Sequence, residues 1–207
     1  MTALLFGGAG TLDYWQGWRF LAVYFAASVA ITLYLARNDP ALLERRTRGG
    51  PWAEKQPAQR LIMLVASAGF IGLLVVPALD RRFGWSHSSA GTELSGDALI
   101  LLGWLGIFFV FRENSFTSAT IELAPDQRVV STGPYAMVRH PMYSTALVML
   151  AGIPLALGSW WGLLVLLVIA PALIWRIFDE ERFLVDSLPG YAEYKQRVRY
   201  RLIPHVW

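Results

Sequence analysis

Residues 141–175 read PMYSTALVML AGIPLALGSW WGLLVLLVIA PALIW, which makes 35 consecutive residues without a charged side chain. At about 1.5 Å per residue, one helix of this length would extend for about 52 Å, far beyond the ~30 Å hydrocarbon core of a bilayer. The stretch is also short for two complete membrane spans. We therefore predict a tight helical hairpin, with helices at about 141–157 and 160–177 and a turn at Gly158-Ser159.

The composition places the rest of the chain in a membrane as well. Of its 207 residues, 55% are hydrophobic and 16% are charged, whereas a soluble domain is about 25% charged. Apolar stretches predict further membrane helices at about 18–36, 61–79 and 97–113. The last is short, and we assign it as a span because it returns the chain to the side that the later motifs need. The predicted fold is an all-α integral membrane protein with about five transmembrane helices, in one domain over 1–207.

The distribution of basic residues predicts the orientation. The 36–60 and 112–140 loops and the tail from 176 onward carry most of the Arg and Lys residues, while the N-terminus and the hairpin turn carry none. By the positive-inside rule, the N-terminus lies outside and the C-terminus lies in the cytoplasm. The preference for Arg over Lys favours a bacterial source, and hence a bacterial inner membrane. We interpret Gly7-Gly8-Ala9-Gly10 as a flexible terminus on the outer side.

Composition also excludes several functions. The chain has no cysteine, which rules out disulfides, thiolate metal sites and a cysteine nucleophile. Its net charge is +3, with the basic residues scattered between apolar runs, which argues against a nucleic-acid-binding surface. We expect no metal site, and we expect membrane lipids among the partners.

Two polar segments flank the hairpin on the predicted cytoplasmic side. They contain VVSTGPY at 129–135, VRHPMY at 138–143, RIFDEE at 176–181, PGY at 189–191 and Tyr194. His140-Pro141 predicts a helix start, because proline fits the first helical position. Free N–H groups and the helix dipole at such a start favour an anion. Arg176 and Glu180 are four residues apart and share one helix face. Because the hairpin brings its two ends together, we predict one cytoplasmic pocket.

Each of these features alone has an ordinary structural explanation. Arg139 and Arg176 could be positive-inside anchors, and the tyrosines of both motifs could belong to an interfacial aromatic belt. Glu180 could be a helical partner of Arg176, and His140 could be a helix cap. The occurrence of all of them at the two ends of one hairpin favours a binding site.

The combined motif resembles the isoprenylcysteine carboxyl methyltransferase family, which is related to the membrane phospholipid N-methyltransferases. The resemblance covers residues 114–207, and Asp39-Pro40 with the following Ala-Leu-Leu-Glu-Arg-Arg also looks like the bacterial branch of the family. Its motifs are Gly-x-Tyr at 133–135, Arg-His-Pro-x-Tyr at 139–143, Arg-x-x-x-Glu-Glu at 176–181, Gly-Tyr-x-x-Tyr at 190–194 and Arg-Leu-Ile-Pro at 201–204.

The resemblance implies S-adenosylmethionine bound by the segments 127–143 and 176–204, and an acceptor that reaches the site from the bilayer. The expected reaction is carboxyl O-methylation of an isoprenoid or a prenyl-cysteine-like molecule, either a small lipophilic molecule or a lipidated substrate. In a bacterium, an isoprenoid or lipid that carries a thiol or an amine is an alternative acceptor. Arg176 would lie nearest the methyl acceptor. The residues implied around the cofactor are Gln127, Arg128, Val129, Val130, Tyr135, His140, Pro141, Met142, Tyr143 and Glu180.

Two other functions are compatible with the motifs. Sterol C14 and C7 reductases end in a similar Arg-His-Pro-like motif and acidic cluster, but they bind NADPH and usually have more membrane helices. A non-enzymatic membrane protein that binds a partner through its tail is the second alternative. It would leave the clustered polar residues without a shared purpose.

Overall fold

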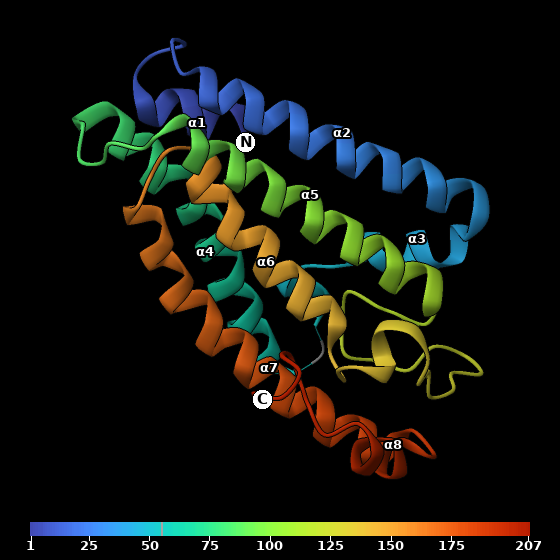
Figure 1. Cartoon of the computed structure of the whole chain (residues 1–207). Coiled ribbons are helices and arrows are strands. Elements are labelled where there is room, and N and C mark those ends of the chain that lie inside the picture. The colour runs from blue at the N-terminus through green and yellow to red at the C-terminus, as the bar shows by residue number, and fades with distance from the viewer. Residues whose placement is uncertain (55) are drawn as a thin grey trace.

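The computed structural model describes residues 1–54 and 56–207, and over these residues every regular element is a helix (Figure 1). Four helical segments are long and apolar enough to cross a membrane: α2 (Trp15–Asn38), α4 (Pro57–Phe83), α5 (Ala90–Glu113) and Trp161–Ser187, which joins η3 (Trp161–Val165) to α7 (Leu166–Ser187). A shorter apolar helix, α6 (Pro141–Ala156), has 16 residues and spans about 24 Å. The prediction of an all-α integral membrane protein with about five membrane helices is confirmed.

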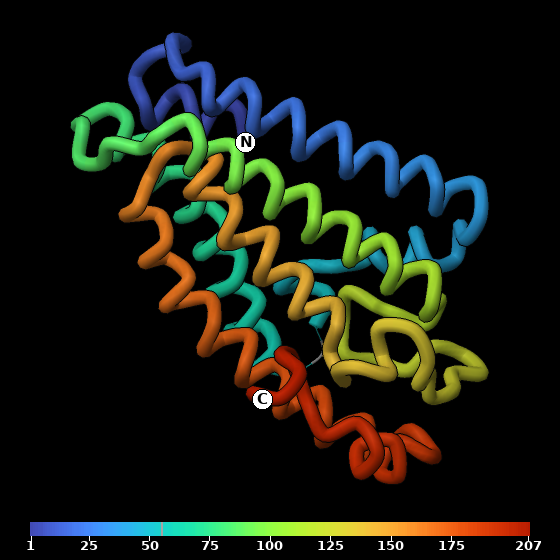
Figure 2. The backbone as a smooth tube through the Cα atoms, in the orientation of Figure 1, coloured from blue at the N-terminus to red at the C-terminus, as the bar shows by residue number. Residues whose placement is uncertain are grey.

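The smaller helices lie at the two ends of this bundle. They are α1 (Thr2–Ala9), α3 (Pro40–Thr47), η1 (Pro51–Ala53), η2 (Gly133–Ala136) and α8 (Tyr191–Arg197). Figure 2 shows α3, the 114–140 segment and the C-terminal tail gathered at one end, with α1, the 84–89 loop and the hairpin turn at the other. The polar motifs are therefore held at one end of the bundle.

The predicted hairpin is formed by α6 and α7. Pro141 occupies the first turn of α6, as its lack of an N–H group favours. The helix ends at Ala156, and Gly158 follows with φ 77°, a left-handed conformation that glycine adopts without steric cost. The Tyr14 hydroxyl donates to the carbonyl oxygen of Leu157 at 2.7 Å and fixes the turn against the start of α2.

The third membrane helix begins earlier than the sequence predicts. Helix α5 starts at Ala90 rather than near 97, so Glu93 and Asp97 lie inside it, both buried. Arg19 of α2 compensates this charge, since it is ion-paired with Asp97 and its Nη2 lies 3.8 Å from a Glu93 carboxylate oxygen. The prediction missed this extension because the partner comes from a helix more than 70 residues away.

The N-terminal glycine segment is helical, so its interpretation as a flexible terminus is wrong. Its first three residues belong to α1 and Gly10 caps the helix end, while Leu5 and Phe6 of α1 are buried in the hydrophobic core. A Cβ at Gly8 would lie 2.9 Å from the Cβ of Ala78 in α4. The glycine thus allows α1 to pack directly on α4.

Helices α5 and α6 pack most closely, because glycines line their contact. A Cβ at Gly103 would lie 2.8 Å from the Met149 backbone nitrogen, and one at Gly152 would lie 2.6 Å from the Gly96 carbonyl oxygen. A side chain at Gly96 would overlap the backbone of Ala156. Small residues let membrane helices approach to backbone contact in this way. The contact fixes α6, and with it the start of the hairpin, against α5.

We expect Gly96→Ala to destabilise the protein, because the α5–α6 contact has no room for a methyl group. Overpacking typically costs about 1–3 kcal/mol. Gly91→Ala, in the same helix, is the matched control, since its Cβ would meet only the Ser89 hydroxyl at 3.7 Å. Thermal unfolding in detergent should show a lower melting temperature for Gly96→Ala only. Equal melting temperatures for the two variants would contradict this packing.

Candidate functional site

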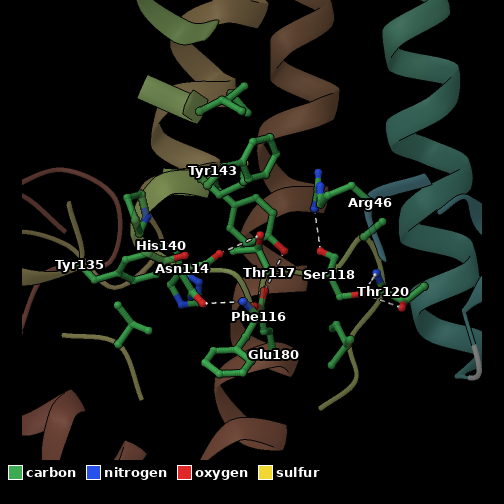
Figure 3. Close-up of a pocket in the computed structure, with 18 of the residues that line it drawn as sticks. Arg46, Asn114, Phe116, Thr117, Ser118, Thr120, Tyr135, His140, Tyr143 and Glu180 are labelled. Carbon is green, nitrogen blue, oxygen red and sulfur yellow. Dashed lines mark hydrogen bonds between the residues drawn. The ribbon is translucent and has the colours of Figure 1, made fainter. Parts of the chain in front are cut away.

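A cavity of about 600 Å³ lies at the end of the bundle where the polar motifs gather (Figure 3). This volume lies within the range of about 300–1,000 Å³ found for small-molecule sites. The structure brings together in its walls all eleven residues that the sequence analysis assigned: Gln127, Arg128, Val129, Val130, Tyr135, His140, Pro141, Met142, Tyr143, Arg176 and Glu180. Their roles toward a ligand remain predictions.

The cavity also extends between the membrane helices, which the sequence analysis did not predict in detail. Its apolar arm is lined from α2, α4 and α5 by Ile31, Leu35, Met63, Ala66, Trp104 and Ile107. The cavity therefore joins a polar end, formed by the loops, to an apolar arm at the depth of the membrane helices. An amphipathic molecule matches this division.

The loop that carries Tyr135 is anchored to α8. Gly133 has φ 56° and allows the tight η2 turn that presents Tyr135. The Tyr194 hydroxyl donates to the Tyr135 carbonyl oxygen at 2.7 Å. Burial raises the pKa of the Tyr135 hydroxyl, so that group stays protonated at neutral pH and can donate a hydrogen bond.

In the cavity wall, hydrogen bonds link two side chains of α7 through one side chain of α6. Arg176 Nε donates to the Tyr143 hydroxyl oxygen at 3.0 Å, and that hydroxyl donates to a Glu180 carboxylate oxygen at 2.7 Å. Arg176 and Glu180 share one face of α7, as their spacing predicted. The tyrosine links the two residues, although the sequence analysis gave them separate roles.

Arg176 is held by residues that the sequence analysis missed. Its Nη1 lies 2.8 Å from the Glu54 carboxylate and donates to the Gln59 side-chain oxygen at 2.9 Å, while Nη2 donates to the Ala119 carbonyl oxygen at 3.0 Å. Glu54 and Gln59 are both buried. They lie more than 110 residues before Arg176 and belong to no motif, so only the fold reveals them.

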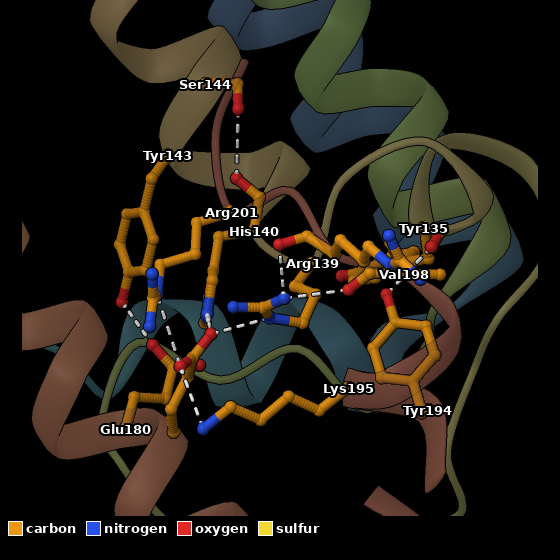
Figure 4. A network of polar contacts seen from close by, with 12 residues as sticks. Tyr135, Arg139, His140, Tyr143, Ser144, Glu180, Tyr194, Lys195, Val198 and Arg201 are labelled. Carbon is orange, nitrogen blue, oxygen red and sulfur yellow. Dashed lines mark hydrogen bonds and ion pairs between the residues drawn. The ribbon is translucent and has the colours of Figure 1, made fainter. Parts of the chain in front are cut away.

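The Glu181 carboxylate gathers four basic side chains, Arg139, His140, Lys195 and Arg201, all of which are labelled in Figure 4. One oxygen accepts from Arg139 Nε at 2.7 Å and lies 3.4 Å from His140 Nε2. The other lies 3.2 Å from Arg201 Nε and 3.5 Å from Lys195 Nζ. Glu181 is 2% exposed and Arg139 is 5% exposed, so the two form a buried ion pair, beside which Arg201 and Lys195 add positive charge. In the sequence, Glu181 is only the last residue of the Arg-x-x-x-Glu-Glu motif and has no predicted role.

The same cluster clamps the C-terminal tail over the start of α6. Arg139 Nη1 donates to the carbonyl oxygens of Val198 and Arg199 at 2.7 and 2.8 Å. The His140 backbone N–H donates to the Arg201 carbonyl oxygen at 2.9 Å, and the Ser144 hydroxyl donates to the Leu202 carbonyl oxygen at 2.6 Å. The tail is thereby fixed as part of the site.

The start of α6 differs from the open anion site that the sequence predicts. The N–H of His140 binds the tail, and the N–H groups of Tyr143 and Ser144 both donate to the His140 carbonyl oxygen, at 3.1 and 3.2 Å. The chain itself therefore satisfies most of these donors. A ligand at this position would rely on side chains more than on the helix terminus.

Comparison with known proteins supports the resemblance expected from the motifs. Residues 92–189 match the family model described as phospholipid methyltransferase, which confirms the resemblance over that segment. A curated relative is the cobalt-zinc-cadmium resistance protein CzcN of Cupriavidus metallidurans, 31% identical over 115 residues. The match covers 55% of this chain and spans about half, 53%, of that relative's length.

We expect Glu181→Gln to loosen the C-terminal tail. The amide keeps the shape of the side chain but leaves the buried Arg139 without its counter-charge, and breaking a buried pair costs about 3–5 kcal/mol. The variant should melt at a lower temperature, and trypsin should cut faster after Arg199 and Arg201. Glu193→Gln, at an exposed position of α8, is the control. Unchanged melting and cleavage in Glu181→Gln would refute a clamping role.

Proposed function

Starting from the phospholipid methyltransferase match of residues 92–189, we propose that the chain is an S-adenosylmethionine-dependent membrane methyltransferase. Its acceptor is lipophilic, and its reaction is the O-methylation of a carboxylate on an isoprenoid or prenyl-cysteine-like molecule. The single observation that carries this proposal is the meeting of all eleven predicted residues in one cavity with a polar end and an apolar arm. The NADPH-dependent reductase and the non-enzymatic protein are the alternatives to exclude.

The side chains of the polar end suit the proposed cofactor. The Glu180 carboxylate can accept charge-assisted hydrogen bonds from an ammonium group, or hydrogen bonds from ribose hydroxyls. Tyr135 and Tyr191 offer aromatic faces for an adenine ring, with Val129 and Leu188 as apolar neighbours in the same wall. These carboxylate, aromatic and apolar side chains already line the cavity, so cofactor binding requires no side chain from another part of the molecule.

The proposed reaction needs no general acid or general base from the protein. When bound, S-adenosylmethionine supplies an electrophilic methyl group on a sulfonium sulfur. Transfer of this group to a carboxylate oxygen of the acceptor would replace the carbon–sulfur bond with a carbon–oxygen bond and would leave the bonding electron pair on sulfur. No proton is transferred, so the cavity residues contribute by aligning the acceptor and excluding water. Arg176, Tyr143 and Glu180 form the aligned wall between acceptor and cofactor.

We assign Glu180 to the cofactor and Arg176 to the acceptor side. Glu180→Gln removes a charge-assisted contact, so affinity for S-adenosylhomocysteine should fall by about tenfold. Arg176→Lys keeps the charge but loses the planar fork, so cofactor affinity should survive while turnover falls. Calorimetry in detergent measures the first effect, and transfer of labelled methyl groups into membrane lipid extracts measures the second.

The exposed variant Glu193→Gln should match the wild type in both assays. Equal loss of cofactor binding in Glu180→Gln and Arg176→Lys would refute the division of labour and leave only a shared structural pair. The wild type should bind S-adenosylmethionine or S-adenosylhomocysteine. Binding of NADPH with neither of these would favour the reductase, and binding of none would favour the non-enzymatic protein.

The proposed orientation puts the cavity in the cytoplasm, where S-adenosylmethionine is made, and the N-terminus outside. It rests on the Arg-rich 36–60 and 112–140 loops and tail. In a bacterial inner membrane, topology reporters fused after Trp207 and inserted within 86–89, just before α5, should report opposite sides. Reporters on the same side would contradict the orientation, whatever the cofactor titration shows.

A further inference from the structure

Arg46 is a cavity residue that the sequence analysis left without a role. It lies in the last turn of α3 and lines the cavity together with Leu43 and Thr47 from the same helix. Its Nη1 donates to the Ser118 carbonyl oxygen at 2.6 Å, and its guanidinium carbon lies 5.5 Å from the centre of the Phe111 ring. Figure 3 shows the guanidinium pointing into the cavity. One carbonyl and one ring thus fix its direction.

Arg46 differs in its charge balance from Arg139 and Arg176, the two buried arginines of the cavity wall, and it is less exposed than Arg128, which also lines the cavity. Arg139 is paired with Glu181, and Arg176 is paired with Glu54. Over residues 1–54 and 56–207, no ion pair joins Arg46 to a carboxylate; its guanidinium instead contacts a neutral carbonyl oxygen and an aromatic ring. Burial lowers the pKa of Arg46 and the neighbouring Arg176 acts in the same direction, while Tyr143, Tyr135 and Glu180 act in the opposite one. An arginine stays charged in a protein, so this partly buried charge has no carboxylate directly paired with it.

The position of Arg46 separates it from Tyr135 and His140, two of the proposed cofactor residues. In Figure 3, Tyr135 and His140 lie on one side of the cavity, while Arg46, Ser118 and Thr120 lie on the other, with Tyr143 between the two groups. Helix α3 directly follows α2, whose Ile31 and Leu35 line the apolar arm. Arg46 therefore lies where the polar end of the cavity meets the arm.

We propose that Arg46 is a specificity-determining residue that holds the anionic head group of the acceptor, whose apolar chain occupies the arm between α2 and α5. This inference rests on the proposed function and deepens it. An acceptor with a cationic amine would place a second positive charge beside the guanidinium of Arg46, which has no carboxylate paired with it. The site therefore selects carboxylates over amines. Arg176, held on several sides by Glu54, Gln59 and Tyr143, is then a positioning residue for the wall beside the acceptor.

The test uses a C15 isoprenoid carboxylate, farnesoate, and its uncharged amide as probes for the full chain in lipid nanodiscs. The wild type should bind farnesoate about ten- to one-hundredfold more tightly than the amide, because a hydrogen-bonded charge is lost in the amide. Arg46→Gln should remove this preference, and Arg46→Lys should keep part of it. Affinity for S-adenosylhomocysteine should stay unchanged in both variants.

Arg45→Gln is the matched control, since it removes the same charge from the adjacent position. Arg45 donates to the Ser115 carbonyl oxygen and does not line the cavity, so its variant should keep the preference for farnesoate. Equal loss of preference in Arg45→Gln and Arg46→Gln would overturn the proposal, as would a wild type that binds both probes equally or binds neither.

Two results distinguish a failure of this inference from a failure of the proposed function. Loss of S-adenosylhomocysteine affinity in Arg46→Gln, with the farnesoate preference retained, would assign Arg46 to the cofactor and overturn the inference alone. Absence of S-adenosylhomocysteine binding in the wild type, with an Arg46-dependent farnesoate preference, would overturn the methyltransferase and leave the anion site. If Arg46→Gln fails to fold, Arg46→Lys and the two wild-type affinities decide the outcome.

Discussion

A buried carboxylate at Glu181 holds together the parts of the chain that form the site. It reaches Arg139 and His140 before α6, Lys195 in α8 and Arg201 in the tail. These groups come from segments that the hairpin brings close together, but the hairpin alone does not fix the positions of these segments relative to one another. Because Arg139 also binds two tail carbonyl oxygens, the carboxylate orients the loop, the helix start and the tail at once. The neighbouring Glu180 is thereby left to face the cavity.

The fold follows from the sequence wherever the signal is local. Thirty-five uncharged residues between two polar motifs require a turned hairpin, and Gly158 supplies the turn that the structure contains. The bounds of α5 could not be predicted in the same way, because Glu93 and Asp97 are tolerated only through Arg19 of another helix. Helix α1 was missed for a related reason, since the room that Gly8 leaves is filled by Ala78 of α4.

In the site, too, residues of local motifs could be predicted from the sequence, whereas partners from distant parts of the chain could not. Residues such as His140, Tyr143 and Glu180 could be grouped from the sequence, because the two ends of a hairpin must meet. Glu54 matches no motif, and Arg46 ends the family-like segment 39–46, to which the sequence assigns no role in the site. Only the packed structure pairs Glu54 with Arg176 and places Arg46 in the cavity wall. Charge compensation, read from ion pairs, then distinguishes an arginine that is held in place from one that is available to a ligand.

The most direct test of the account is an experimental structure of the chain in nanodiscs with S-adenosylhomocysteine. We predict density for the ligand between the 127–143 segment and α7, with the Glu180 carboxylate in contact with its ammonium or ribose. The apolar arm between α2 and α5 should stay free of the ligand. Density at another place in the molecule, or ligand contacts that leave Glu180 and Tyr135 untouched, would contradict the account.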